Sequence, residues 1–151
     1  MKTFEITQAN RMALLKLTSG LSSSQLQTIP SGFSNNVLWN LAHITAIQQK
    51  LMYGLSGIPY ALPEKFVKQY ENGTFPKQNV DNDEIKIIRE YLETSIPKAT
   101  EDWETGKLKT VIPFETRIKV RLVEFGEVAQ FNQFHEGVHT GIILSILKFI
   151  R

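Results

Sequence analysis

The feature that most constrains this chain is a set of four segments with apolar residues at helical spacing, separated by connections that proline and glycine interrupt. The first segment runs from about Thr3 to Ser19, and Gly20 is suited to end it. Its predicted apolar stripe comprises Ile6, Ala9, Ala13 and Leu17. The second segment follows a cap at Ser34 or Asn35 and reaches Gly57.

The third and fourth segments show the same periodicity. The third opens on the acidic run DNDE, which suits a helix N-terminus, and Pro97 should kink or shorten it. Its predicted stripe comprises Ile85, Ile88, Leu92, Ala99 and Trp103. The fourth runs from about Lys119 to the end of the chain. Its predicted stripe comprises Val128, Phe131, Val138, Ile142, Ile146 and Phe149.

Two long connections separate these segments. SGIPYALPEKFVKQYENGTFPKQNV, before the third segment, contains Pro59, Pro63 and Pro76 and can cross the helices. TGKLKTVIPFETRIKV, before the fourth, contains Pro113 and a partial alternation that indicates an extended crossing with a short strand. Such lengths allow helix orders other than simple up-and-down neighbours. The sequence therefore predicts one all-α domain over residues 1–151, a four-helix bundle with long crossover connections.

Composition narrows the class of protein. With 42% hydrophobic residues the chain has the make-up of one ordinary soluble domain. A net charge of +2 is too small for strong nucleic-acid binding, so we expect no nucleic-acid partner. The chain has no cysteine, which excludes disulfides, thiolate metal ligands and a cysteine nucleophile. Its polar start and the lack of a long apolar run predict a cytoplasmic protein with no membrane partner.

The stretch FNQFHEGVHTGI holds two of the three histidines, His135 and His139. Residues four apart lie on one face of a helix, about 6 Å apart along its axis. His135 falls between Phe131 and Val138 on the predicted stripe, and His43 lies on an inward stripe of the second segment. All three imidazoles should point inward, where a polar group needs a partner. A divalent metal is such a partner.

The histidine pattern also has a simpler explanation. Chance alone places two of three histidines four apart roughly 4% of the time. A histidine in a protein core usually bonds to a backbone carbonyl or a water instead of a metal. Spacing and face therefore leave both a metal site and purely structural histidines open.

Two segments carry a resemblance to a known family. HEGVHTGIILSILKFI in the fourth segment and NNVLWNLAHITAIQQ in the second resemble the DinB-like superfamily of four-helix bundles, which includes YfiT-like thiol transferases and metal-dependent hydrolases. The resemblance implies that His43, His135 and His139 bind a divalent metal, and that the chain forms a homodimer. Many members carry an acidic residue one turn after the first histidine, where Ile47 and Gln48 offer no carboxylate here.

Three neutral imidazoles suit zinc, nickel or ferrous iron and leave coordination positions open. Such an ion lowers the pKa of a bound water toward roughly 7 and favours the thiolate of a bound thiol. The resemblance therefore implies a metal-dependent enzyme acting on a small molecule, as a thiol S-transferase or a hydrolase. Any low-molecular-weight thiol must come from a cosubstrate. Two alternatives stay open: a non-catalytic metal-binding stress-response protein, and a fold whose histidines are only structural.

Several polar and aromatic residues have a functional and a structural reading. Trp39, Asn36 and Tyr60 are the candidates for a substrate pocket, although core packing or helix capping also explains them. Asn40 can orient an imidazole or cap a helix.

On the fourth segment, Glu136 lies about 100° round the helix from His135, which favours a solvated or inter-helix charge over a metal ligand. Gly137 and Gly141 weaken a helix by about 1 kcal/mol each, which the close approach of a ligand or, more simply, close helix packing would explain.

The second segment is apolar on more than one side of its helix. The residues off the His43 stripe are Val37, Leu38, Leu41 and Ile44. A homodimer interface would cover this extra apolar surface.

Overall fold

The computed structural model describes residues 1–150, and most of them are helical. The elements are α1 (Lys2–Thr18), α2 (Ser23–Gln27), α3 (Val37–Gln49), the π-helix η1 (Lys50–Gly54), α4 (Glu64–Tyr70), α5 (Asn82–Glu104), β1 (Phe114–Glu115), β2 (Arg121–Leu122) and α6 (Phe125–Ile150). The prediction of an all-α fold is confirmed. Among the residues described, no helix is long and apolar enough to cross a membrane.

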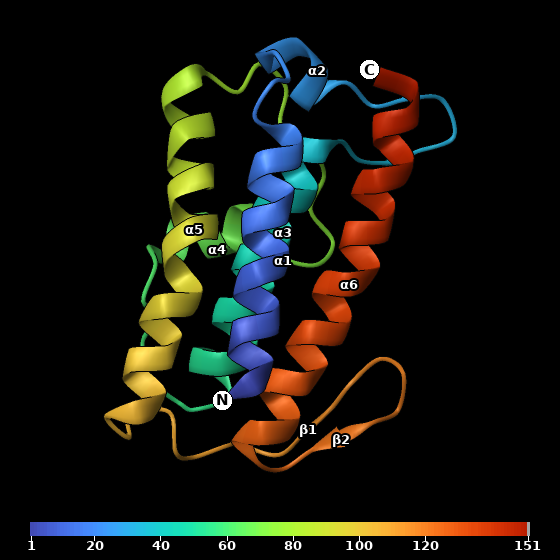
Figure 1. Ribbon diagram of the computed structural model, residues 1–151. Coiled ribbons are helices and arrows are strands. Elements are labelled where there is room, and N and C mark those ends of the chain that lie inside the picture. Colours follow the sequence, from blue (N-terminus) through green and yellow to red (C-terminus); the bar gives the residue numbers. More distant parts are fainter. Residues whose placement is uncertain (151) are drawn as a thin grey trace.

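Four long helices lie side by side and do not follow chain order around their common axis (Figure 1). Packing contacts join α1 to α5, α5 to α3, α3 to α6 and α6 back to α1. In Figure 1, α1 and α6 run upward whereas α3 and α5 run downward. The long connection after η1 therefore returns the chain to the upper end before α5 begins.

Helix α3 is the central element of the core. Every one of its residues is buried, which is expected for a helix that is apolar all round. Val37, Leu38, Leu41 and Ile44 are at most 2% exposed. Other helices of the same chain cover them, so the apolar surface that suggested a homodimer on α3 is not available, and that argument is wrong.

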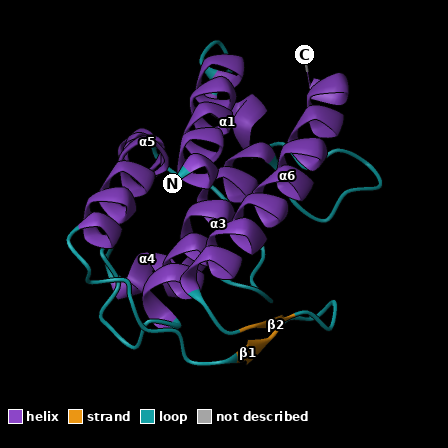
Figure 2. Cartoon of the chain, turned by 60° about the horizontal axis from the view of Figure 1, so that its bottom comes forward, coloured by secondary structure: helices purple, strands orange, loops and turns teal. Residues whose placement is uncertain are grey.

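The helix starts differ from the sequence prediction in two places. Asn36, rather than Ser34 or Asn35, caps α3, because its Oδ1 accepts from the Trp39 backbone N–H at 2.8 Å. Helix α6 begins at Phe125 instead of Lys119. The preceding residues form the antiparallel pair β1–β2, which projects beyond the helices (Figure 2).

The buried face of α1 also differs from the predicted stripe. Ile6 is 47% exposed, and the buried residues are Phe4, Thr7, Arg11, Leu14 and Thr18. Polar side chains occupy part of this face: Thr7 and Thr18 donate to backbone carbonyls of their own helix. A pattern based on apolar residues alone therefore selected the wrong side of α1.

The stripe predicted on α6 is correct only in part. Val128 and Ile146 are buried, whereas Val138 is 46% and Phe149 66% exposed. A methyl group added to Gly137 or Gly141 would meet no side chain or neighbouring helix within 4 Å. Close packing inside this chain therefore does not explain these two glycines, contrary to expectation.

The segment between η1 and α5 crosses the helices and contains α4, which packs against α3. Its start is fixed by Gln49, whose Oε1 accepts from the backbone N–H groups of Ala61 and Leu62 at 2.8 and 3.2 Å. Further along, Lys50 forms an ion pair with Glu71. These contacts hold the crossover, and with it α4, in place beside α3.

Candidate metal centre

Three histidines from two helices meet at the interface of α3 and α6. His43 lies on α3, and His135 and His139 lie one turn apart on α6. Their candidate ligand nitrogens all lie within 4.8 Å of one another. The ring centroids are 5.2 Å apart for His43 and His135, and 4.6 Å apart for each of the other two pairs. The structure thus brings together the three residues selected from the sequence.

The orientation of His43 is set by the crossover. Its Nδ1 lies 2.6 Å from the backbone carbonyl oxygen of Tyr70, the last residue of α4. A carbonyl oxygen only accepts, so Nδ1 carries the proton and donates it. The Nε2 of His43 is therefore the nitrogen with a free lone pair, as a metal ligand requires. The sequence offered no signal for this contact because it uses only the backbone of Tyr70.

The orientation of His139 is set by Asn40 on α3. The Asn40 Nδ2 donates to Asn35 Oδ1 at 2.9 Å and to the Asn36 carbonyl at 2.7 Å. These two acceptors fix the orientation of the amide, so the Asn40 Oδ1 faces His139 Nδ1, at 2.7 Å. His139 Nδ1 must donate, and its Nε2 lone pair is left free. Of the two roles considered for Asn40, the orienting one is observed.

His135 differs from the other two histidines because its buried Nδ1 has no hydrogen-bond partner within residues 1–150. An unpaired buried nitrogen is costly unless a ligand satisfies it or the imidazole turns. A metal ion bound at this nitrogen would remove that cost.

Burial keeps all three imidazoles neutral near pH 7. It lowers the pKa of His135 to about 3, with the neighbouring His139 and His43 adding to the effect. It lowers the pKa of His139 to about 4, again with a contribution from His43. The pKa of His43 is lowered by burial too, although its hydrogen bond to Tyr70 acts in the opposite direction. Neutral imidazole is the form that binds a metal ion.

The candidate substrate residues lie at different distances from the histidines. Trp39 stacks on His43, with ring centroids 4.4 Å apart and an angle of 13° between the planes. Its Nε1 donates to Thr74 Oγ1 at 3.2 Å. Asn36 is buried and caps α3. Tyr60 packs instead against Gly54 at the far end of η1.

Glu136, next to His135, is buried and does not join the metal group. It forms a bidentate pair with Arg11 of α1, at 2.7 and 3.0 Å, and both side chains are at most 1% exposed. The expectation of a solvated charge is wrong, and the inter-helix alternative is correct. Among the residues described, the histidine triad includes no carboxylate, in keeping with Ile47 and Gln48 on α3.

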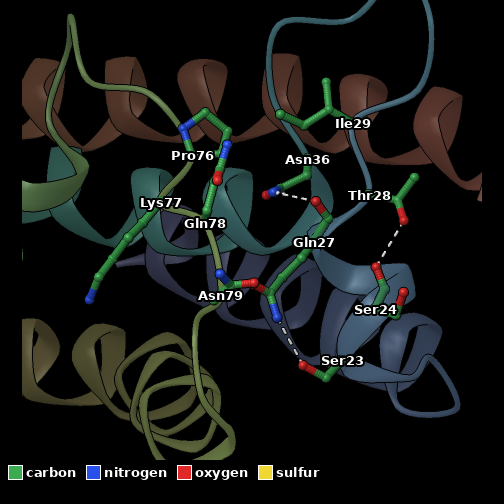
Figure 3. A pocket seen from close by; sticks show the side chains of 10 residues that line it. All are labelled: Ser23, Ser24, Gln27, Thr28, Ile29, Asn36, Pro76, Lys77, Gln78 and Asn79. Carbon is green, nitrogen blue, oxygen red and sulfur yellow. Dashed lines mark hydrogen bonds between the residues drawn. The ribbon is translucent and has the colours of Figure 1, made fainter.

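A cavity of about 510 Å³ lies between α2 and the crossover (Figure 3). Hydroxyl and amide side chains line much of it, and Asn36 donates to the Gln27 carbonyl there at 2.9 Å. None of the three histidines lines this cavity. Asn36 nonetheless connects it to the metal centre, because Asn40 and Trp39 both bond to Asn36.

The family model described as DinB superfamily matches residues 6–143, which include all three histidines, all of α3 and α5 and most of α1 and α6. A comparison with curated proteins finds no match to this chain.

Proposed function

The chain belongs to the DinB superfamily, and we propose that it is a metal-dependent enzyme acting on a small molecule, as a thiol S-transferase or a hydrolase. The observation that carries this proposal is the convergence of three neutral imidazoles, two of them with an Nε2 lone pair fixed by partners outside the triad. The buried Nδ1 of His135, which has no hydrogen-bond partner among the residues described, also supports the proposal because a bound ion would satisfy it.

In this proposal His43, His135 and His139 hold a divalent ion, with zinc, nickel and iron as candidates for three nitrogen ligands. Such an ion supplies Lewis acidity, which favours the deprotonated form of a thiol or water at neutral pH. The chain itself supplies rigid placement, because Tyr70 and Asn40 hold two imidazoles in one tautomer. A thiol substrate must be free in solution because the chain has no cysteine.

The residues proposed to contact substrate are Trp39, Asn36 and Tyr60. Trp39 has the best support because its ring already lies against His43. Asn36 lies between the cavity of Figure 3 and the triad. For Tyr60 the proposal rests on the sequence alone.

Metal content tests the first half of the proposal. Protein purified without an affinity tag should contain close to one divalent ion per chain by elemental analysis, and His43→Ala, His135→Ala or His139→Ala should each lower that content sharply. Gln130→Ala, at an exposed position on α6 near His135 and His139, is the matched control. Full metal content in all three histidine variants would place the site elsewhere.

Turnover tests the second half of the proposal. Metal-loaded protein is given a panel of biological thiols with a reactive electrophile such as a bimane, and separately a panel of esters and amides. Thiol-dependent product that is lost in His139→Ala supports transfer, and thiol-independent hydrolysis lost in the same variant supports a hydrolase.

A non-catalytic metal-binding protein is the second candidate. The observation favouring it is that none of the three histidines lines the cavity of about 510 Å³ beside α2. Stable metal binding without turnover on any thiol, ester or amide would select this candidate.

We also propose a homodimer, now on α6 instead of α3. The exposed large apolar residues of α6 are Phe134, Val138, Leu144 and Phe149. Family resemblance and this uncovered face support the proposal. Light scattering should give a dimer that Val138→Glu converts to a monomer, and a monomeric wild type would contradict it.

A further inference from the structure

A second cavity lies at the other end of α3, away from the histidines. It has a volume of about 460 Å³ and is lined by Tyr53, Ile58, Pro59, Ala61, Lys98, Asp102 and Lys107. Tyr53 follows His43 by ten residues on the α3–η1 helix, which corresponds to about 15 Å along its axis. The cavity is therefore separate from the metal centre.

The π-helix η1 shapes one side of this cavity. Single π-helical turns are uncommon and are often found at functional sites. Tyr53 lies on this turn, and its hydroxyl donates to Asp102 Oδ2 at 2.9 Å. Just beyond it, Gly57 has a positive φ of 71° and turns the chain, so that Ile58, Pro59 and Ala61 form an apolar side.

The polar side of the cavity has more hydrogen-bond donors than acceptors. Asp102 is 3% exposed, and its Oδ1 already accepts from Lys98 at 2.9 Å and from Lys107 at 2.7 Å. Its Oδ2 accepts from Tyr53. Among the residues described, Lys107 has no other partner, so two of its three N–H donors remain free at the rim, where its side chain is 59% exposed.

Lys107 is the cation most available to a ligand at this cavity. Lys98 pairs with both Asp102 and Glu101, at 2.9 and 3.0 Å, whereas Lys107 pairs with Asp102 alone among the residues described. Although burial acts to raise the pKa of Asp102, both lysines and Tyr53 hold that pKa below its ordinary value. The lowered pKa favours the carboxylate form of Asp102, and three donors from Lys98, Lys107 and Tyr53 already bond to its two oxygens.

We propose that this cavity binds a small carboxylic acid with an apolar body, such as a medium-chain fatty acid or an aryl acetate. Its carboxylate accepts from Lys107 and Lys98, and its hydrocarbon part lies against Ile58, Pro59 and Ala61. The volume is in the range of small-molecule sites. This binding is independent of the metal centre and of the enzymatic proposal.

Octanoate is the probe, and octanol and octylamine are its neutral and cationic counterparts. Isothermal titration of the full chain should give one saturable octanoate site, with no comparable binding of the alcohol or amine. Lys107→Gln should weaken binding about tenfold, the effect of losing one charge-assisted hydrogen bond. Lys109→Gln, an exposed neighbour that does not line the cavity, should leave the affinity unchanged.

A second variant tests the apolar side of the cavity by reducing its volume and leaving the lysines unchanged. Ala61→Phe fills the apolar side from an exposed position, so it should abolish octanoate binding without unfolding the chain. His135→Ala should bind octanoate as the wild type does. Equal binding of octanol, equal effects of Lys107→Gln and Lys109→Gln, or no saturable octanoate site would each overturn the proposal.

Discussion

Among single residues, Asn40 has the most specific role. Its amide bonds on one side to Asn35 and to the Asn36 backbone, and on the other to His139. A side chain in the first turn of α3 thus fixes the tautomer of a histidine on α6. Sequence reasoning could name Asn40 as able to orient an imidazole, but it could not choose which one, because the partner lies 99 residues away.

Replacing Asn40 should weaken metal binding without removing a ligand. Asn40→Leu deletes the acceptor for His139 Nδ1–H, and loss of such an orienting partner typically costs about 10- to 100-fold in metal affinity. Asn40→Asp keeps an acceptor for His139 but loses the two hydrogen bonds donated by Nδ2, so its affinity should lie between those of Asn40→Leu and wild type. Competition with a chromophoric chelator measures both, with Asn82→Leu, exposed on α5, as control. Equal affinities for Asn40→Leu and wild type would show that Asn40 does not position His139.

Among the elements, α5 is the one whose continuity needs explanation, since Pro97 lies inside it. The helix is neither interrupted nor shortened at Pro97, contrary to one of the two expected outcomes. Proline lacks an N–H, which leaves the carbonyl four residues earlier, that of Glu93, without its helical partner. Gln8 of α1 donates to that carbonyl at 3.0 Å. A neighbouring helix therefore supplies the hydrogen bond that proline removes.

The hydrogen bond from Gln8 should matter only while residue 97 is proline. Gln8→Ala should lower the free energy of unfolding by about 0.5–1.5 kcal/mol. In a Pro97→Ala background the Glu93 carbonyl regains a helical N–H, so the same change should cost less. Urea denaturation of the four proteins in this double-mutant cycle measures the difference. Strictly additive effects of the two substitutions would show that Gln8 does not replace the hydrogen bond that Pro97 removes.

The buried pair of Arg11 and Glu136 joins three helices. Besides Glu136 on α6, Arg11 donates to Ser95 Oγ on α5 at 2.6 Å. Glu136→Gln leaves the Arg11 charge buried and unpaired, so it should destabilise the fold by about 3–5 kcal/mol. The double variant Arg11→Met, Glu136→Leu removes both charges and should be more stable than Glu136→Gln alone. Denaturant titrations of the metal-free proteins measure the two free energies of unfolding. A double variant less stable than Glu136→Gln would contradict this prediction.

At the scale of the whole molecule, the helical class and the four long helices followed from apolar spacing, and the three histidines followed from spacing plus resemblance. The buried faces of α1 and α6 could not be predicted in the same way. Arg11 and Glu136 lie on those faces, and a charged residue is assigned to the surface unless its distant partner is known. The π-helix was also missed, because KLMYG carries no signal that separates it from the end of an α-helix.

Stability of the metal-free protein should fall as the solution becomes acidic. The pKa of His135 in the folded state is about 3 and that of His139 about 4, whereas unfolded histidine has a pKa of about 6.5. Between about pH 6.5 and 4 the unfolded chain therefore binds protons that the folded chain does not. The free energy of unfolding should drop by up to about 1.4 kcal/mol per pH unit for each imidazole, and should not change through these groups above pH 7.

Urea denaturation at a series of pH values checks this slope. His135→Leu, His139→Leu double-variant protein lacks both imidazoles and should show a shallower dependence. A wild-type stability that stays constant from pH 7 to pH 5 would contradict the prediction.

Because Trp39 stacks on His43, its fluorescence should report metal binding at the histidines. The chain has two tryptophans. The second, Trp103 on α5, contacts Phe4 on α1 instead of a histidine. The fluorescence emission of Trp39 should change when an ion binds to the stacked imidazole of His43. The emission of Trp103 should stay the same. Open-shell nickel or iron should quench the Trp39 emission, while zinc, with its filled d shell, should only shift it. The fluorescence spectrum therefore distinguishes zinc from the other candidate metals, and Trp39→Phe removes the signal.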